Sequence, residues 1–494
     1  MKRKKKLSLF LSLALVAASV FIPQIQSYAS QIGVTINGSA VQFNASTGSP
    51  FVDSSNRTQV PLRATMEAYG CDVDWDRNTR TAIVQKDGKT VKVPIGSNNI
   101  SINGYQVEND TVAVIKDNRT YLPIRAVLEA FGGYVSWNQA AQSVSVDNTF
   151  PLLKIHFIDV GQADAALIDI GNTEVLIDGG NNANGQQVVN YLRPYVDGAL
   201  DYVIATHTDA DHIGGLDDVL AAYQVDTVIG SGDTSSTSTY RDYWAAVQSE
   251  PNSQYMDDSD MVLPLEGGAE LEIIETGDNN GDTNGNSVIA QLNYGKVKAL
   301  FTGDIDSDVE SQNLDKFEDV DVLKVAHHGS KTSTSSSFLS VIHPEYAVIS
   351  AGSNNTYGHP SADTLSRLSA VGCKTLGTFK SGTVSLSSNG KVYNLNKSNY
   401  LTIADAGAGT GGSTLVTPPG GNTPTNPSGG GTTVNPQPQT PVTTSYIGNK
   451  NSKIFHKSTC SSVKRMSASN KVPLSSVSAA LSTGYKPCKI CNPA

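Results

Sequence analysis

Residues 151–400 repeat one arrangement, in which a short apolar run is followed directly by Gly, Asp or His. Ile155–Val160, Tyr202–Ala205 and Leu323–Val325 are examples. Runs of this length, rich in branched residues, are typical of buried β-strands. Segments with a helical pattern lie between the runs, at residues 186–195, 217–223, 240–249 and 335–342. Strands that alternate with helices predict an α/β fold, in which polar residues at strand ends form the functional loops.

Residues able to bind metal gather in motifs at these strand ends. The densest motif spans Thr206–Gly215 and holds four potential ligands within six residues: His207, Asp209, Asp211 and His212. Carboxylates and imidazoles at this density would destabilise one another, and one or two divalent cations would relieve that cost. Four more motifs follow other runs: Asp159–Asp164, Ile177–Gly180, Thr302–Asp304 and Ala326–Ser330.

Taken in order, these motifs resemble the hydrolase domain of the ComEC competence proteins, a branch of the metallo-β-lactamase fold. The resemblance is carried, between residues 159 and 360, by DVGQxD, DGG, HTDADHIGG, GNS, TGD, LKVAHHGS and NxYGHP. It implies a metallo-β-lactamase αββα sandwich over residues 151–400.

The resemblance also implies a centre of two divalent cations. The implied ligands are His207 and Asp209 for one cation, Asp211 and His212 with His327 for the other, and Asp304 as a bridge. His327 is preferred because it directly follows the strand, and His328 is the alternative. Asp164, Asp178 and Asn286 are expected to surround the ligands. Because Asp209 stands where most members of the fold have His, the centre is oxygen-rich; Zn²⁺ is favoured and Mn²⁺ is the alternative.

The implied mechanism is hydrolysis by a hydroxide held between the two cations, with Asp211 and His359 as catalytic candidates. His359 would contact the substrate or protonate the leaving group, and a purely structural role in its Pro-flanked loop stays open. The predicted function is that of a phosphodiesterase or nuclease acting on DNA or nucleotides. Alternatives are hydrolysis of cell-wall phosphodiesters of the teichoic acid type, of another ester or of a lactam, and a non-catalytic cell-wall-binding protein.

Charge limits how such a substrate could bind. Residues 151–400 contain 13 Lys and Arg against 34 Asp and Glu, a net charge of −21. This region would repel a polyanion unless bound cations offset the charge locally, which favours short or single-stranded substrates. Residues 446–494 carry eight Lys and Arg and no acidic residue, and could attract nucleic acid or an anionic cell wall.

The first 29 residues are predicted to be a secretory signal peptide. The pattern consists of a basic start, an apolar run at Leu7–Phe21, and small residues before the expected cleavage after Ala29. The alternative is an uncleaved membrane anchor. The protein is therefore expected to be secreted or attached to the cell surface, in a Gram-positive bacterium. No protein partner is predicted.

An internal repeat occupies residues 32–148. The sequence RTQVPLRA at residues 57–64 recurs as RTYLPIRA at residues 119–126, a spacing of 62. The stretch resembles the small α+β stalk domain at the N-terminus of copper amine oxidases, whose copper chemistry belongs to another domain. We expect a spacer or a surface-attachment module, with cell wall as its partner.

Residues 404–445 are rich in Gly, Pro and Thr and predict a disordered linker. The tail that follows, residues 446–494, contains a Cys₃His set: His456, Cys460, Cys488 and Cys491. Its spacing suits one structural Zn²⁺, and a disulfide is the alternative. The tail resembles the Ada-like metal-binding module of some secreted nucleases and hydrolases.

Overall fold

The computed structural model describes residues 32–109, 111–277, 282–353 and 355–407, and in the C-terminal part residues 446–450, 452–457, 463, 466, 470–474, 480 and 485–488. The predicted signal peptide, most of the predicted linker, and the predicted ligands Cys460 and Cys491 lie outside the described residues. Contacts divide the chain into two compact units, residues 1–414 and 415–494. Among the described residues, no helix has the length and apolar character needed to cross a membrane.

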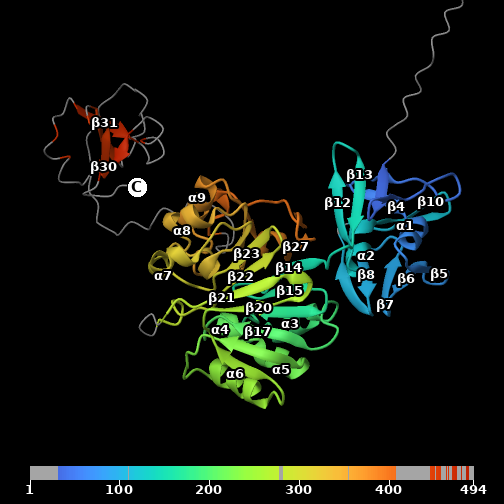
Figure 1. Ribbon diagram of the computed structural model, residues 1–494, viewed down its shortest axis with the longest axis horizontal. Helices are drawn as coiled ribbons and strands as arrows, with labels where there is room; N and C mark the ends of the chain where they lie inside the picture. Colours follow the sequence, from blue (N-terminus) through green and yellow to red (C-terminus); the bar gives the residue numbers. More distant parts are fainter. Residues whose placement is uncertain are drawn as a thin grey trace, which may run out of the picture. The chain divides into compact units, whose positions relative to one another are not determined.

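The stalk consists of small sheets with two short helices between them (Figure 1, blue to cyan). One sheet has the order β12 (Tyr134–Asn138), β13 (Ser143–Asp147), β1 (Gly33–Ile36), β2 (Ser39–Ala40). A second has the order β10 (Val114–Lys116), β11 (Arg119–Pro123), β4 (Thr58–Pro61), β3 (Phe51–Val52). A third runs from β5 (Asp72–Asp76) through β6 (Thr81–Lys86), β7 (Lys89–Pro94) and β8 (Asn99–Ile102) to β9 (Tyr105–Glu108). The helices are α1 (Leu62–Ala68) and α2 (Ile124–Ala130).

The two sequence repeats pair with each other inside the stalk. Strand β4 of the first copy lies antiparallel to β11 of the second, with Val60 opposite Leu122. Both residues are fully buried, and so are the matching helix residues Met66 and Leu128. The hydroxyl of Tyr69 donates a hydrogen bond of 3.0 Å to the carbonyl of Phe131, its own counterpart. The repeated motif is therefore explained by packing.

Two mixed sheets form the centre of the region 151–400. The first has the order β19 (Gln254–Asp257), β18 (Val225–Gly230), β17 (Leu200–Ala205), β16 (Thr173–Ile177), β15 (Ala166–Ile170), β14 (Leu153–Phe157), β27 (Val384–Ser388), β28 (Tyr393–Leu395). The second has the order β20 (Met261–Pro264), β21 (Glu270–Ile274), β22 (Ile289–Tyr294), β23 (Val297–Phe301), β24 (Val322–Lys324), β25 (Tyr346–Ile349), β26 (Lys374–Gly377).

Helices cover the outer face of each sheet (Figure 1). They are α3 (Gly185–Leu192), α4 (Ala210–Ile213), α5 (Leu216–Ala222), α6 (Ser238–Ser249), α7 (Ser307–Gln312), α8 (Ser336–Ile342), α9 (Ala362–Ala370) and α10 (Thr378–Ser381). Short 3₁₀ turns are η1 (Glu266–Gly268), η2 (Leu314–Lys316), η3 (Ala326–Gly329) and η4 (Ile403–Asp405).

The apolar side chains fill the spaces between these layers. Between the sheets, the rings of Phe157 and Phe301 stack with centroids 5.9 Å apart. Outside the first sheet, α3, α5 and α6 contribute buried side chains such as Leu192 and Val219 to a second core. Outside the second sheet, α8 and α9 do the same with Phe338 and others. This helix–sheet–sheet–helix order confirms the predicted αββα sandwich.

The C-terminal unit contains a small sheet with the order β31 (Lys471–Leu474), β29 (Tyr446–Asn449), β30 (Ile454–Lys457), β32 (Lys486–Pro487). Strands β30 and β32 are parallel, with Phe455 opposite Pro487. The next residue along each strand is a predicted metal ligand, His456 and Cys488, and both are buried. The register therefore brings two of the four predicted ligands side by side.

Candidate metal centre

The carboxyl ends of neighbouring parallel strands bring the predicted site residues together. Strands β16 and β17 are parallel in the first sheet, and β23 and β24 are parallel in the second. Asp178 directly follows β16, and His207 lies two residues beyond β17. Asp304 follows β23, and His328 lies in the η3 turn beyond β24. Parallel strands have their carboxyl ends at one edge of a sheet, so residues far apart in sequence meet there.

Three groups of three side chains share His212. The first is His207, His212 and Asp304, the second is Asp211, His212 and His328, and the third is Asp164, Asp178 and His212. In each group the potential ligand atoms all lie within 4.8 Å of one another. The Nε2 atom of His212 is 3.4 Å from Oδ1 of Asp304. Overlapping groups of this kind can hold two neighbouring cations.

The hydrogen bonds of the three buried histidines direct their other ring nitrogens into a common space. Each Nδ1 lies near a fixed oxygen: 3.1 Å from Thr206 Oγ1 for His207, 2.8 Å from Asp178 Oδ2 for His212, and 3.0 Å from the Ser350 carbonyl for His328. The Thr206 hydroxyl lies 2.8 Å from Asp178 and donates to that carboxylate, so it can accept from His207. In the neutral form of each ring, Nδ1 would carry the proton and Nε2 would offer its lone pair to a cation.

These Nε2 atoms have no hydrogen-bond partner among the described residues, although they are buried. The same holds for Oδ1 of Asp304. Buried polar atoms without a partner are rare because they cost free energy, and a cation would satisfy all four. Imidazole nitrogens with carboxylate oxygens are a donor set that Zn²⁺ and neighbouring first-row metals accept. The residues present thus fit a divalent metal centre.

The charges in the site act strongly on the histidines. Burial acts to lower the pKa of His328, but Asp304 and Asp164 outweigh it and raise that pKa to about 10. Asp304 and Asp178 likewise hold the pKa of His212 above its usual value against the effect of burial. In contrast, burial and the charge of His212 lower the pKa of His207 to about 3. The carboxylates therefore create a site that favours positive charge, which a cation can supply.

The geometry places His328, not His327, within the cluster, the reverse of the preference drawn from the sequence. Nε2 of His328 is 3.3 Å from Oδ2 of Asp211 and 3.7 Å from Oδ2 of Asp304. Nε2 of His327 also lies 3.7 Å from Asp304, but its side chain is 28 % exposed. Both histidines have left-handed backbone, with φ of 50° and 52°. This turn directs the second histidine inward, which a position after a strand does not reveal.

The remaining predicted residues lie around this core. Asp209 is at the rim, with its side chain half exposed and Oδ2 3.9 Å from Nε2 of His207. Asn286 donates to the carboxylate of Asp233 at 3.1 and 3.2 Å. The next residue, Ser287, lies at the metal ligands: its Oγ accepts the backbone N–H of Asp304 and is 3.4 Å from Nδ1 of His207.

Sequence reasoning missed Lys324, which lies next to the site. Its Nζ is 2.6 Å from Oδ2 of Asp164, and both residues are buried. Although burial alone would raise it, the charges of Lys324 and His328 hold the pKa of the Asp164 carboxyl below its usual range. A lysine inside the short apolar strand β24 is rare enough to have been a signal.

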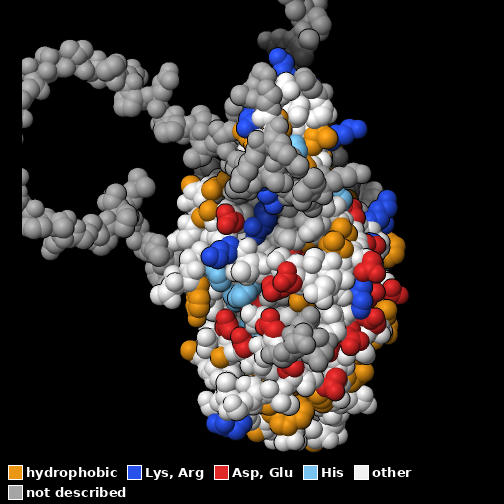
Figure 2. All heavy atoms as spheres, turned by 90° about the vertical axis from the view of Figure 1, so that its left-hand side faces the viewer, with side chains coloured by type: hydrophobic (Ala, Val, Ile, Leu, Met, Phe, Trp, Pro, Cys, Tyr) orange, Lys and Arg blue, Asp and Glu red, His pale blue; other side chains and the backbone are white. Residues whose placement is uncertain are grey.

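His359 lies at the opening of the site. Oε1 of Gln162 accepts the backbone N–H of Gly352, so the Gln162 amide nitrogen faces Nδ1 of His359, at 3.4 Å. An amide nitrogen can only donate, so the proton of His359 is on Nε2. Burial and the charges of His328 and His327 lower the pKa of His359 to about 4, so the ring is neutral at physiological pH. Figure 2 shows pale-blue histidine side chains on this face, with red carboxylates beside them.

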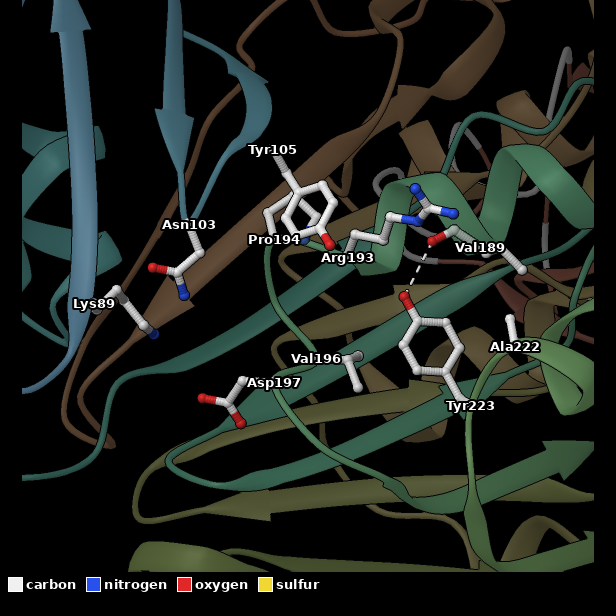
Figure 3. Close-up of a pocket in the computed structure, with 10 residues that line it drawn as sticks. All are labelled: Lys89, Asn103, Tyr105, Val189, Arg193, Pro194, Val196, Asp197, Ala222 and Tyr223. Atoms are coloured by element: carbon white, nitrogen blue, oxygen red, sulfur yellow. Dashed lines mark hydrogen bonds between the residues drawn. The ribbon is translucent and has the colours of Figure 1, made fainter.

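A separate cavity of about 540 Å³ lies where the stalk meets α3 (Figure 3). In it the guanidinium of Arg193 lies 5.8 Å from the centroid of the Tyr105 ring. The Tyr223 hydroxyl donates to the carbonyl of Val189 at 3.1 Å. The residues lining this cavity include none of the predicted site residues.

Comparison with protein families identifies both large domains. Residues 158–353 match the metallo-beta-lactamase superfamily, and residues 35–146 match the copper amine oxidase N-terminal domain. The chain therefore contains a metallo-β-lactamase domain, whose fold is usually hydrolytic and binds divalent metal, preceded by a stalk domain. Both resemblances seen in the sequence are confirmed. The resemblance of the C-terminal module stays a prediction.

Curated relatives include proteins of competence and recombination. The chain is 28 % identical over 258 residues to ComE operon protein 3 of Bacillus subtilis, covering 47 % of this chain and 32 % of that protein. It is 30 % identical over 229 residues to competence protein ComA of Neisseria gonorrhoeae, covering 45 % and 30 %. Recombination protein 2 of Haemophilus influenzae is 29 % identical over 222 residues, covering 44 % and 26 %. The chain thus spans a third or less of the length of these relatives.

Among solved structures, the metallo-beta-lactamase fold protein YhfI from Bacillus subtilis is 14 % identical to this chain, with a TM-score of 0.36. The match covers 49 % of this chain and all of that one.

Proposed function

We propose that this protein is a secreted, metal-dependent phosphodiesterase that acts on DNA or nucleotides. The observation that carries the proposal is the set of three buried histidines whose free Nε2 atoms face one another and Asp304. Two neighbouring cations suit phosphodiester hydrolysis because they can contact the attacking and the leaving oxygen together. The names of the ComEC-like relatives, which concern competence and recombination, agree with a DNA substrate.

The ligands divide into two sets around His212 and Asp304. His207 and Asp209 would hold one cation, Asp211, His212 and His328 the other, and Asp304 would contact both. When bound, the cations would supply an activated water and would screen the charge of the phosphate. The histidine nitrogens favour Zn²⁺, and the larger share of carboxylate oxygens around the first cation leaves Mn²⁺ as the alternative.

The protein's own groups prepare the site for this chemistry. Asp178 fixes the tautomer and orientation of His212, and the Ser350 carbonyl does the same for His328. Such outer partners strengthen metal ligands. His359, neutral and with its proton on Nε2, can donate a hydrogen bond to an anionic oxygen at the opening of the site.

The C-terminal unit is proposed to bind one structural Zn²⁺. Its support is the register of β30 and β32, which sets His456 beside Cys488, and the Nδ1 atom of His456, which is buried without a hydrogen-bond partner among the described residues. Cys460 and Cys491 would complete the site. The basic tail and the stalk are proposed to keep the enzyme at the cell wall or near nucleic acid.

The test compares cleavage of bis(p-nitrophenyl) phosphate and single-stranded DNA before and after chelation and refilling with Zn²⁺ or Mn²⁺. Activity should return with metal and disappear in Asp211→Ala. The matched control is Asp226→Ala, which removes an exposed carboxylate from β18. Bound metal without turnover of either substrate would redirect the proposal to cell-wall phosphodiesters or to a binding protein. Absence of metal binding would refute it.

A further inference from the structure

The loop that follows β25 is held in shape by one buried side chain. Oδ1 of Asn355 accepts the backbone N–H groups of Tyr357 and His359, each at 3.1 Å. Its Nδ2 donates to the carbonyls of Gly352 and His359, at 2.8 and 2.7 Å. These four hydrogen bonds support the loop without using the side chain of Tyr357.

Tyr357 nevertheless has a defined orientation. Its ring lies over that of His359, with centroids 5.8 Å apart and planes 26° apart. His359 in turn lies over His328, at 6.3 Å and 25°. Three successive rings, each tilted by about 25° from the next, therefore lead from the surface to His328 of the candidate metal centre. We call Tyr357, His359 and His328 the ring column.

The outer end of the ring column is open to solvent. Tyr357 is 71 % exposed, the largest exposure of any large apolar side chain in the described part of the chain. An exposed aromatic ring alone is ordinary. Here, however, one face of the ring packs against His359, which itself lies beside His328, and the rest of the ring is open to solvent. Such a ring is ready to receive a second flat group.

We propose that Tyr357 determines specificity by stacking against a nucleobase next to the scissile phosphodiester. The inference rests on the proposed function and narrows its substrate to phosphodiesters that carry an unpaired base. Stacking on an aromatic ring tolerates every base, because each has a π-face. A base inside a duplex is already stacked, so single strands, ends and short nucleotides are the substrates that Tyr357 selects.

Stacking also explains how a strongly acidic domain could bind an anionic substrate. With a net charge of −21 over residues 151–400, the domain gains little from phosphate contacts beyond the metal centre. A ring binds the base without adding cationic side chains. A polyol phosphate of the cell wall has no flat group to stack, so Tyr357 favours a nucleotide over a wall polymer.

The test measures KM and kcat of the full-length, metal-loaded protein with two matched substrates. One is a thymidine dinucleotide. The other is the same phosphodiester with an abasic tetrahydrofuran residue in place of each nucleoside, so that both bases are missing. Tyr357→Ala should raise KM for the dinucleotide about 10-fold, with little change for the abasic substrate. Tyr357→Phe should behave as wild type, because the ring is kept. The control is Tyr105→Ala, which removes an exposed stalk tyrosine.

Four results would overturn the inference. An equal loss on both substrates would mean that Tyr357 supports the site in another way, and a loss in Tyr357→Phe would assign the effect to the hydroxyl. Wild type that cleaves both substrates equally well would exclude stacking while the proposed function stands. Wild type that cleaves neither substrate would refute the proposed function, and stacking with it.

Discussion

At the scale of single residues, the consecutive histidines 327 and 328 have different surroundings. His328 is buried between Asp211 and Asp304, whereas His327 is partly exposed and contacts the edge of the cluster. Because a metal ligand needs a fixed, desolvated position, only one of the two should be required for metal binding.

Replacing each histidine in turn tests this difference. His328→Ala should lose about one cation per chain, because it removes one of the few ligands of the second cation. His327→Ala should keep the wild-type metal content. The measurement is elemental analysis of the purified protein after dialysis against buffered Zn²⁺. Equal metal loss in both variants would contradict the geometry.

The buried pair of Lys324 and Asp164 gives a second prediction at this scale. Lys324→Met should lower the free energy of unfolding by about 3–5 kcal/mol, because it leaves a buried carboxylate without its partner. Chemical denaturation at neutral pH measures the loss, with Lys296→Met, an exposed lysine, as control. The pKa of Asp164 is lowered in the folded state, so the pair stabilises the fold above about pH 4 and is lost as the pH falls further. A variant as stable as wild type would show that the pair contributes nothing.

At the scale of strands and helices, the sequence predicted where the metal centre lies better than it predicted which side chains contact one another there. Strand ends gather at one sheet edge, so placing Asp178, His207 and Asp304 together required only the strand pattern. Lys324 could not be paired with Asp164 in this way, because 160 positions separate them and no local pattern records the contact. The expected helices at 186–195 and 335–342 correspond to α3 and α8, with ends shifted by at most three residues.

The sequence analysis did not predict helix α9, and the reason is physical. Its sequence, ADTLSRLSA, contains Asp, Thr and Ser, which have modest helix propensity. What stabilises it is a side-chain cap, in which Ser361 accepts the N–H of Thr364, together with the burial of Leu365 and Leu368. Packing against the second sheet therefore decides what local propensity leaves open.

A group of acidic residues around strands β15 to β17 predicts that stability depends on pH. Burial, followed by the charges of Asp169, Asp197 and Asp201, raises the pKa of Glu174 to about 8. The folded protein thus holds a proton that the unfolded chain releases near pH 4.5, so this group destabilises the fold as the pH rises from about 4.5 to 8. Glu174→Gln should raise Tm by about 4 °C at pH 8 and leave it unchanged at pH 4. Calorimetric scans at the two pH values measure this difference. Equal shifts in Tm at both values would refute the raised pKa of Glu174.

At the scale of the whole molecule, charge is divided between the acidic metallo-β-lactamase domain and the basic tail. If the tail attracts long nucleic acid, neutralising Lys450, Lys457 and Lys486 to Gln should weaken binding of long single-stranded DNA by about 10-fold at low salt. Cleavage of a dinucleotide should not change, because that substrate needs only the metal centre and Tyr357. Fluorescence anisotropy and initial rates measure the two effects. Unchanged binding would assign the basic tail to another partner.

The pairing of the two stalk repeats has a consequence for how such a domain can exist. Val60 faces Leu122, its own counterpart, and the residues on either side exchange places across the pair: Pro61 faces Tyr121 and Gln59 faces Pro123. The contact therefore has local pseudo-two-fold symmetry and joins equivalent surfaces of the two repeats, as a homodimer interface does. A chain carrying a single repeat should self-associate through this same strand, and the stalk can be understood as a dimer whose two subunits share one polypeptide.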